Sequence, residues 1–459
     1  MPRTVLCLAA IAAFALPCRA DETVSTPETL IRLSVSPAPA PKPALRYLLL
    51  PELREMNPGN PIQNYMKCFM EQQKFFFDKE AFERRDKLLS MPLKELPAQE
   101  LKDYGSFALR QADWAARLDT PDWQFLLTIR TDGVSARIPD VQEMRTLARA
   151  LQVRFRAEIA LGRFDDALKT AKTMFAMSRH LGEHLVFIGD LVGIAIAAVT
   201  ASSLEEMLQQ PGCPNLYWAL TNLPVPLVSI DKGTEGERVG ILAEFHDLDD
   251  SAPMSAARIK KFIAHMDKIL SEPGKPSITA ALDARAKDEK TVIAARRRLV
   301  EYGLPEERLL RFPALQVILL DEKREYEVRR DDTMKLMNLP IWQVQSLAAD
   351  IEKANKAPTV FAETLAEGIF NVRKSQVRLD QRIALLRHVE ALRLYAADHH
   401  GSLPAKLSDV SVPLPDDPST GKPFRYEVIG NTAHLRGSPP FGEDKNPGAN
   451  LHYEVSLQK

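Results

Sequence analysis

Apolar residues with a helical spacing run through most of the chain between residues 60 and 400, and this pattern constrains the fold more than any other feature. In its clearest part, Leu147, Leu151, Phe155 and Ile159 recur four positions apart, with arginine and glutamate between them. Residues four apart lie on one face of a helix, so the pattern predicts an amphipathic helix. Prolines separate it from segments with the same spacing, as is typical of helix ends. The same reasoning predicts helices over residues 64–89, 98–118, 256–270, 278–302, 315–337 and 372–400.

A short turn joins the helix around Leu151 to a second helix. Gly162 ends the first helix, because glycine readily adopts the left-handed conformation found there, and apolar residues resume at Phe164, Ala167 and Leu168. A connection this short makes the two helices antiparallel neighbours. The pattern Gly162-x-Phe164-x-x-Ala167 resembles the turn and second helix of a tetratricopeptide repeat, over about one unit of roughly 34 residues. We therefore predict a mainly α fold, an irregular stack of antiparallel helical hairpins that is TPR-like in part.

The character of the chain changes after His400, where a small β-hairpin module is predicted. Every second residue from Phe424 to Val428 is apolar, which indicates a half-buried strand. Gly430-Asn431 is a two-residue turn, and a returning strand carries Ala433 and Leu435.

This C-terminal region also carries two motifs in order. They are Leu394-Tyr395-Ala396 with Gly401-x-Leu403-Pro404, and Asp417-Pro418-x-x-Gly421-Lys422-Pro423-x-x-Tyr426. Together they resemble the soluble head of type II secretion pseudopilins. Pseudopilins begin with their own apolar assembly helix, whereas the helix over Val372–Arg393 is charged. The resemblance therefore implies the local fold, with structural roles for Asp417 and the turn at Gly421, and does not imply pilus assembly.

Four further segments carry a resemblance that extends over the whole chain. They are Glu143-Met144-Arg145-x-Leu147-Ala148-Arg149, Gly162-Arg163-Phe164-Asp165-x-Ala167, Leu191-Val192-Gly193-Ile194-Ala195 and Pro214-Asn215-Leu216-Tyr217-Trp218-Ala219-Leu220. They are similar to segments of uncharacterised, predicted-secreted helical proteins of planctomycete-type bacteria. The resemblance implies export and a helical fold, and it brings no activity with it.

The start of the sequence has the layout of a secretory signal peptide, residues 1–20. Arg3 supplies a positive charge, residues 4–16 are apolar, and Ala20 is a small residue at the expected cleavage site. The apolar run is shorter than the roughly 20 residues of a spanning helix, and an uncleaved anchor is the alternative. We expect an exported protein, periplasmic or extracellular, whose residues 21–45 form a Pro-rich linker.

The rest of the chain divides into three predicted parts. These are an N-terminal helical domain over 46–225, a second helical region over 226–370, and a long helix with the β-hairpin module over 371–459. The most apolar later stretch, 185–201, contains Asp190 and suits a buried core helix better than a membrane span. We therefore expect no membrane span once the signal peptide is removed.

The charge balance and the missing motifs exclude several classes of function. The chain has 60 Lys+Arg and 61 Asp+Glu, and this formal net charge of −1 argues against a dedicated nucleic-acid binder. The sequence also contains no phosphate loop, no nucleophile elbow, no dinucleotide-binding glycine pattern and no C-x-x-C.

One segment matches a metal motif. His180-Leu181-Gly182-Glu183-His184 fits H-x-x-E-H, in which two histidines on one helix face bind zinc and the glutamate acts as general base. A third ligand would come from Glu205, Glu206 or Glu244. The alternative, which we favour, is the end of a helix at Gly182, with no metal and no cofactor.

Two cysteines remain after removal of the signal peptide, Cys68 and Cys213. In an oxidising compartment they could form one disulfide. Two buried free thiols are the other interpretation.

Three functions follow as hypotheses. The first is an exported helical scaffold without catalytic activity, which binds a partner protein or peptide on its helical body. The second is a secreted zinc-dependent hydrolase that uses His180, Glu183 and His184. The third is an accessory of a secretion or pilus-like system.

Overall fold

The structure is a computed structural model that describes residues 28–270, 277–354, 359–361 and 369–458. The predicted signal peptide lies outside these residues. The chain forms two compact units, which we describe separately. Unit 1 contains Gln124–Arg137 and Thr234–Arg373, and unit 2 contains the remaining described residues. The fold is mainly helical with one small sheet near the C-terminus, as the sequence predicts.

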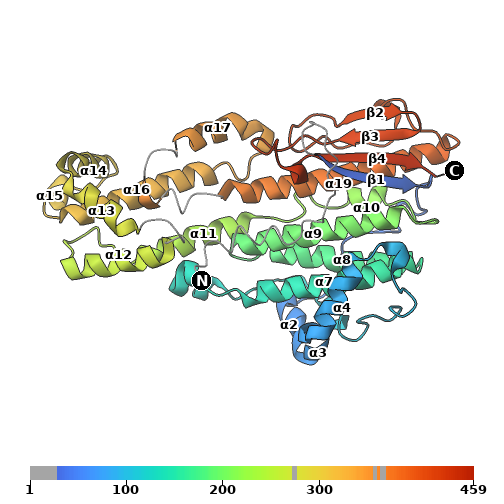
Figure 1. The fold of residues 1–459 in the computed structure, drawn as a ribbon, viewed down its shortest axis with the longest axis horizontal. Coiled ribbons are helices and arrows are strands. Elements are labelled where there is room, and N and C mark those ends of the chain that lie inside the picture. Colours follow the sequence, from blue (N-terminus) through green and yellow to red (C-terminus); the bar gives the residue numbers. More distant parts are fainter. Residues whose placement is uncertain (1–27, 271–276, 355–358, 362–368, 459) are drawn as a thin grey trace. The chain divides into compact units, whose positions relative to one another are not determined.

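Unit 2 combines a set of long helices with the sheet (Figure 1). The helix that continues from unit 1 is α19 (Ile369–Asp398), which belongs to unit 2 from Lys374 on. The other helices are α2 (Pro61–Glu71), α3 (Gln73–Phe77), α4 (Lys79–Ser90), α5 (Arg110–Ala115), α7 (Pro139–Ala160), α8 (Phe164–Leu181), α9 (Phe187–Leu208) and α10 (Tyr217–Thr221). The strands are β1 (Thr29–Val35), β2 (Arg425–Ile429), β3 (Thr432–Arg436) and β4 (Leu451–Leu457).

Helices α7, α8 and α9 form the centre of unit 2 and run alongside one another (Figure 1). Gly162 has a φ of +68° and separates α7 from α8, and the amide of Arg163 donates to the carbonyl of Glu158 at 2.9 Å. This left-handed glycine ends α7 and satisfies its last carbonyls. Leu151 and Phe155 on α7 and Phe175 on α8 are fully buried. The predicted hairpin and its apolar face are thus confirmed.

Helix α9 is largely apolar, and none of its residues is classed as exposed. Among the described residues it is the one helix that is long and apolar enough to cross a membrane by length and composition, and 61% of its most apolar window is buried. Its burial against α7 and α8 is what the core helix of a folded unit shows.

The sheet has the strand order β1-β4-β3-β2. The predicted hairpin of β2 and β3 is present, with Gly430 and Asn431 between the strands. Strand β4 pairs antiparallel with β3 and parallel with β1. One face of the sheet is apolar and buried, with Ala433, Leu435 and Val455 at its centre.

Strand β1 corrects the prediction of a linker over residues 21–45. Thr29–Val35 pairs with Leu451–Leu457 along its whole length. Its alternation places Leu33 and Val35 in the core and Arg32 in solvent, and such alternation is the signature of a half-buried strand. The prolines that follow this segment do not interrupt the ladder, because they lie outside it.

The C-terminal module belongs to the same unit as the N-terminal helices, whereas we expected a separate part over 371–459. Asp417 fixes its first loop, because Oδ1 accepts the amide of Ser419 at 2.9 Å and Oδ2 accepts the amide of Ser438 at 2.8 Å. Gly421 has a φ of +64° in the same loop. Both residues therefore have structural roles.

Unit 1 is all helical within the described residues. Its core contains Phe245, Phe262, Leu299 and Tyr326. Its helices are α6 (Leu126–Asp132), α11 (Asp231–Glu244, in this unit from Thr234), α12 (Ala256–Leu270), α13 (Ile278–Lys287), α14 (Glu289–Glu301), α15 (Glu306–Leu309), α16 (Ala314–Met334) and α17 (Ile341–Ala354).

Two predicted long helices are broken in the structure. The helix expected over 64–89 is divided into α2, α3 and α4, and the helix expected over 278–302 is divided into α13 and α14. Asp78 and Asp288 begin new helices at these breaks, because their carboxylates accept amide hydrogen bonds of the next turn.

Candidate functional site

His180 is a buried residue of the last turn of α8. Its Nδ1 lies 3.0 Å from the hydroxyl oxygen of Tyr65 on α2, and its carbonyl accepts a hydrogen bond of 2.9 Å from Trp123 Nε1. Burial lowers the pKa of its imidazole to about 4. His180 is therefore neutral at physiological pH and connects α8 to α2.

His184 lies outside α8, which ends at Leu181 with Gly182 as its cap. Its ring centroid is 4.9 Å from that of Trp123, and its Nε2 is 3.7 Å from Asp140 Oδ2. The zinc prediction requires His180 and His184 one turn apart on a continuous helix, with Glu183 between them. The early end of α8 removes that arrangement, and Nδ1 of His180 faces Tyr65 whereas Nε2 of His184 faces Asp140.

The three glutamates considered as a third ligand are held elsewhere. Glu205 binds Arg382 and Tyr453, and Glu206 binds Arg156. Glu244 belongs to unit 1, where it accepts the amide of Val134 at 2.8 Å and lies 2.6 Å from His265 Nε2. These contacts leave the predicted site without a common centre.

Cys68 and Cys213 are free thiols, and both are buried. Burial raises the pKa of each thiol to about 12. Of the two interpretations that the sequence left open, the structure has two buried free thiols and no disulfide between Cys68 and Cys213.

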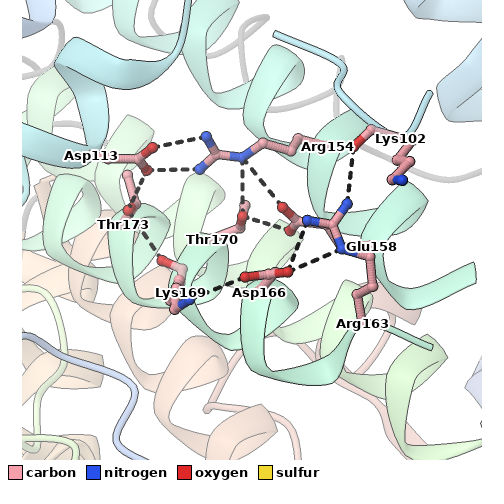
Figure 2. Close-up of polar contacts among 9 residues, drawn as sticks. All are labelled: Lys102, Asp113, Arg154, Glu158, Arg163, Asp166, Lys169, Thr170 and Thr173. Carbon is pink, nitrogen blue, oxygen red and sulfur yellow. Dashed lines mark hydrogen bonds and ion pairs between the residues drawn. The ribbon is translucent and has the colours of Figure 1, made fainter. Parts of the chain in front are cut away.

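A polar network joins α5 to the α7–α8 hairpin (Figure 2). Arg154 on α7 binds both oxygens of Asp113 on α5, with N···O distances of 2.9 and 2.7 Å, and its Nε donates to Thr170 Oγ1 at 3.0 Å. Thr170 donates to Glu158 at 2.7 Å, and Thr173 donates to Asp113 at 2.8 Å. The network thus ties helix α5 to both helices of the hairpin.

The charges of this network stabilise one another. Burial raises the pKa of the Glu158 carboxyl, and the positive charge of Arg154 opposes part of that rise. Burial would lower the pKa of Arg154, but the carboxylates of Asp113 and Glu158 raise it overall. Arg154 therefore stays charged, and its bidentate contact with Asp113 is of the stronger class of hydrogen bonds.

Helix α5 and the turn segment before it present large apolar side chains to solvent. Phe107 precedes the helix by one turn and is 57% exposed, and Trp114 is 52% exposed. Phe107 lies in the turn segment seven positions before Trp114. A hydrogen bond of 3.4 Å between Gln111 and Glu71 joins this side to the exposed side of α2, where Met70 is 75% exposed. We call Met70, Phe107 and Trp114 the apolar face.

The structure brings His434, His452 and Glu454 together on the outer face of the sheet, although no sequence motif marks these three residues. A signal was present, because His434 lies in one alternating segment, and His452 and Glu454 are two apart in another. Strand β4 had not been predicted, so its register against β3 was not available.

Comparison with known proteins gives no assignment. No protein-family model, no curated protein and no solved structure matches this chain. The proposed function therefore depends on the geometry of the candidate sites.

Proposed function

We propose that the chain is an exported binding protein that holds an amphipathic segment of a partner protein on the apolar face of α2 and α5. The observation that carries this proposal is the exposure of Met70 on α2, of Trp114 on α5 and of Phe107 just before α5. Large apolar side chains that gather on a surface are typical of interaction sites, and tryptophan is enriched among the residues that dominate binding energy.

The anchoring of α5 supports a binding role for Trp114. Its neighbour in the sequence, Asp113, is held by Arg154 and Thr173, so the backbone that carries the indole is fixed before any partner arrives. A surface that is already ordered loses less conformational entropy on association. Full burial of a large apolar side chain contributes about 1.5–3 kcal/mol, and roughly half of that remains to be gained at Phe107 and Trp114, which are 57% and 52% exposed.

The apolar face has polar surroundings that would orient a partner. The guanidinium of Arg110 lies 4.9 Å from the ring centroid of Phe107, and Glu71 and Gln111 border Met70 and Trp114. An apolar centre with a charged border is the usual composition of a non-obligate interface. This arrangement favours an amphipathic segment over a wholly apolar one.

Export is part of the proposal and is supported by the composition of residues 1–20. The buried thiols of Cys68 and Cys213 are compatible with an oxidising compartment, because an inaccessible thiol with a raised pKa forms little thiolate.

The test is site-specific photo-cross-linking in the native host. A photoreactive amino acid is placed at position 107 or 114, and at position 429 as a control, because Ile429 is similarly exposed (57%) on β2. We expect cross-links from 107 and 114 to one amphipathic segment, identified by mass spectrometry, and none to that segment from 429.

A purified peptide of that segment should bind the Trp114→Ala protein at least about 10-fold more weakly, as expected for a residue at the centre of an interface. The Ile429→Ala protein should bind as the wild type does. Equal cross-linking from all three positions, or unchanged affinity of Trp114→Ala, would refute the proposal.

A further inference from the structure

The outer face of the sheet in unit 2 brings two histidines and a glutamate together. In the ladder of β3 and β4, His434 is directly opposite Glu454, and His452 is opposite Arg436. His452 and Glu454 are two residues apart on β4, so all three side chains project from the same face. The side chains of His434 and His452 are only 12% and 7% exposed, and that of Glu454 is 24% exposed.

The ligand atoms of these residues converge. His434 Nδ1 is 3.0 Å from His452 Nε2 and 3.9 Å from Glu454 Oε1, and one ligand atom from each residue lies within 4.8 Å of the other two. Two nitrogens bound to one tetrahedral zinc ion at about 2.0 Å lie roughly 3.3 Å apart. The observed separation of the imidazole nitrogens therefore needs only a small adjustment to hold a metal.

Second partners orient two of the three ligands. His452 Nδ1 lies 2.9 Å from Glu28 Oε2. A carboxylate accepts at that distance, so Nδ1 carries the proton and the lone pair of Nε2 points at His434. Arg32 Nε donates to Glu454 Oε2 at 2.9 Å, which leaves Oε1 toward His434. A carboxylate behind a histidine ligand is a recurrent feature of zinc sites.

The charges around the cluster also favour a cation. Glu28, Glu427 and Glu454 are its carboxylates, and Arg32 and Arg436 are its guanidiniums. Arg436 is paired with Glu427 and Arg32 with Glu454, so neither arginine charge is left uncompensated by a carboxylate.

We propose that His434, His452 and Glu454 bind one zinc ion, with Glu28 as the positioning residue behind His452. Two imidazoles and one carboxylate match the ligand preference of zinc and differ from the all-oxygen sets of calcium and magnesium. Without metal, the proton on His434 Nδ1 is donated to His452 Nε2. When zinc binds, this proton moves to Nε2 of His434, so that Nδ1 binds the metal as part of a neutral imidazole, and a water molecule completes the tetrahedron. This site is independent of the apolar face.

The test is calorimetric titration of Zn²⁺ into the full exported chain, without a histidine tag and after treatment with a chelator. We expect saturable binding of one zinc ion per chain. Mg²⁺ should give no heat of binding. The Glu28→Gln protein should bind zinc about 10–100-fold more weakly, and His452→Gln and Glu454→Gln should weaken binding further.

His399→Gln is the matched control, because His399 is exposed and lies elsewhere in the same unit. Its zinc affinity should equal that of the wild type. The wild-type titration alone can overturn the proposal, since it does not depend on whether a variant folds. Absence of saturable zinc binding, or zinc binding that persists in Glu28→Gln and His452→Gln at wild-type affinity, would show that this cluster is not a metal site.

Discussion

Tyr453 on β4 donates a hydrogen bond of 2.5 Å to Glu205 on α9, and this contact fastens the sheet to the central helices of unit 2. Arg382 on α19 binds the same carboxylate, with N···O distances of 2.8 and 2.7 Å. Glu205 and Tyr453 are buried, so the carboxylate depends on these two donors for the hydrogen bonds that water would otherwise supply.

Removing one donor from Glu205 should destabilise unit 2. Tyr453→Phe removes one hydrogen bond to a charged group, and we expect the free energy of unfolding to fall by about 1–3 kcal/mol. Arg382→Met leaves a buried carboxylate without its counter-charge, and the loss should be larger, about 3–5 kcal/mol. Urea denaturation followed by circular dichroism measures both values. Equal effects of the two substitutions would mean that the charge of Arg382 contributes nothing beyond its hydrogen bonds.

The stability of unit 2 should fall between pH 6.5 and pH 4. Burial lowers the pKa of His180 and of His388 from 6.5 to about 4. In this range the unfolded chain binds protons that the folded unit does not, so the free energy of unfolding decreases as the pH decreases. The expected slope is about 1 kcal/mol per pH unit for each histidine.

Tryptophan fluorescence can follow this transition in a Trp342→Phe background, because the other three tryptophans, Trp114, Trp123 and Trp218, belong to unit 2. His388→Gln should remove part of the pH dependence, whereas substitution of exposed His399 should leave it unchanged. An identical slope in the wild type and in His388→Gln would contradict the assignment.

The contact of Arg154 with Asp113 should control both the position of α5 and binding at the apolar face. Asp113→Ala removes a bidentate partner, and we expect a loss of about 2 kcal/mol in stability. The partner peptide should also bind more weakly, although Asp113 belongs to the anchoring network and not to the apolar face. Asp103→Ala is the control, because it is an exposed acidic residue of the same region. If Asp113→Ala loses stability but keeps full affinity, the anchor does not position Trp114.

The two thiols should be inert in the folded protein. Cys68 and Cys213 are buried, and their pKa values are raised to about 12. A thiol reagent at neutral pH therefore cannot reach either sulfur, and almost none of either thiol is in the reactive thiolate form. We expect no reaction in buffer and two equivalents per mature chain in guanidinium chloride. Reaction of one thiol per chain without denaturant would contradict this prediction and would show that the structure around that cysteine opens locally.

Removal of the signal peptide should leave Asp21 as the first residue of the exported chain. Intact mass measurement of protein from the cell envelope and N-terminal sequencing test this cleavage. A full-length mass in a membrane fraction would instead establish an uncleaved anchor.

The sequence predicts best where one local rule decides the structure. The spacing around Leu151 and the glycine at 162 define α7, its end and the following helix, and the alternation from Phe424 defines the hairpin. The sequence predicts Asp78 and Asp288 inside longer helices, whereas both cap the start of a new helix. The sequence alone does not distinguish an aspartate inside a helix from one that caps it, because the difference lies in the backbone conformation. The strands β1 and β4 were missed because no local turn joins them, and they pair with each other from distant parts of the chain.

For the candidate sites, too, a local sequence pattern and the tertiary structure have to be distinguished. The segment His180–His184 matches H-x-x-E-H, but Gly182 ends the helix that this motif requires. The sequence match therefore does not place the two histidines one turn apart on a helix. His434, His452 and Glu454 match no motif, because their proximity depends on the register of β3 against β4. Exposure of Phe107 and Trp114 likewise depends on which side of α5 faces the hairpin, and tertiary packing decides that side.

The parallel pairing of β1 with β4 has a consequence for the order of events in the cell. The ion pair between Arg32 and Glu454 joins residues 422 positions apart, so the ribosome releases β1 long before β4 exists. Strand β1 therefore has no partner strand until nearly the whole polypeptide has been synthesised. Pairing of β1 with β4 cannot precede the synthesis of the last residues of unit 2, which makes closure of the sheet a late step of folding.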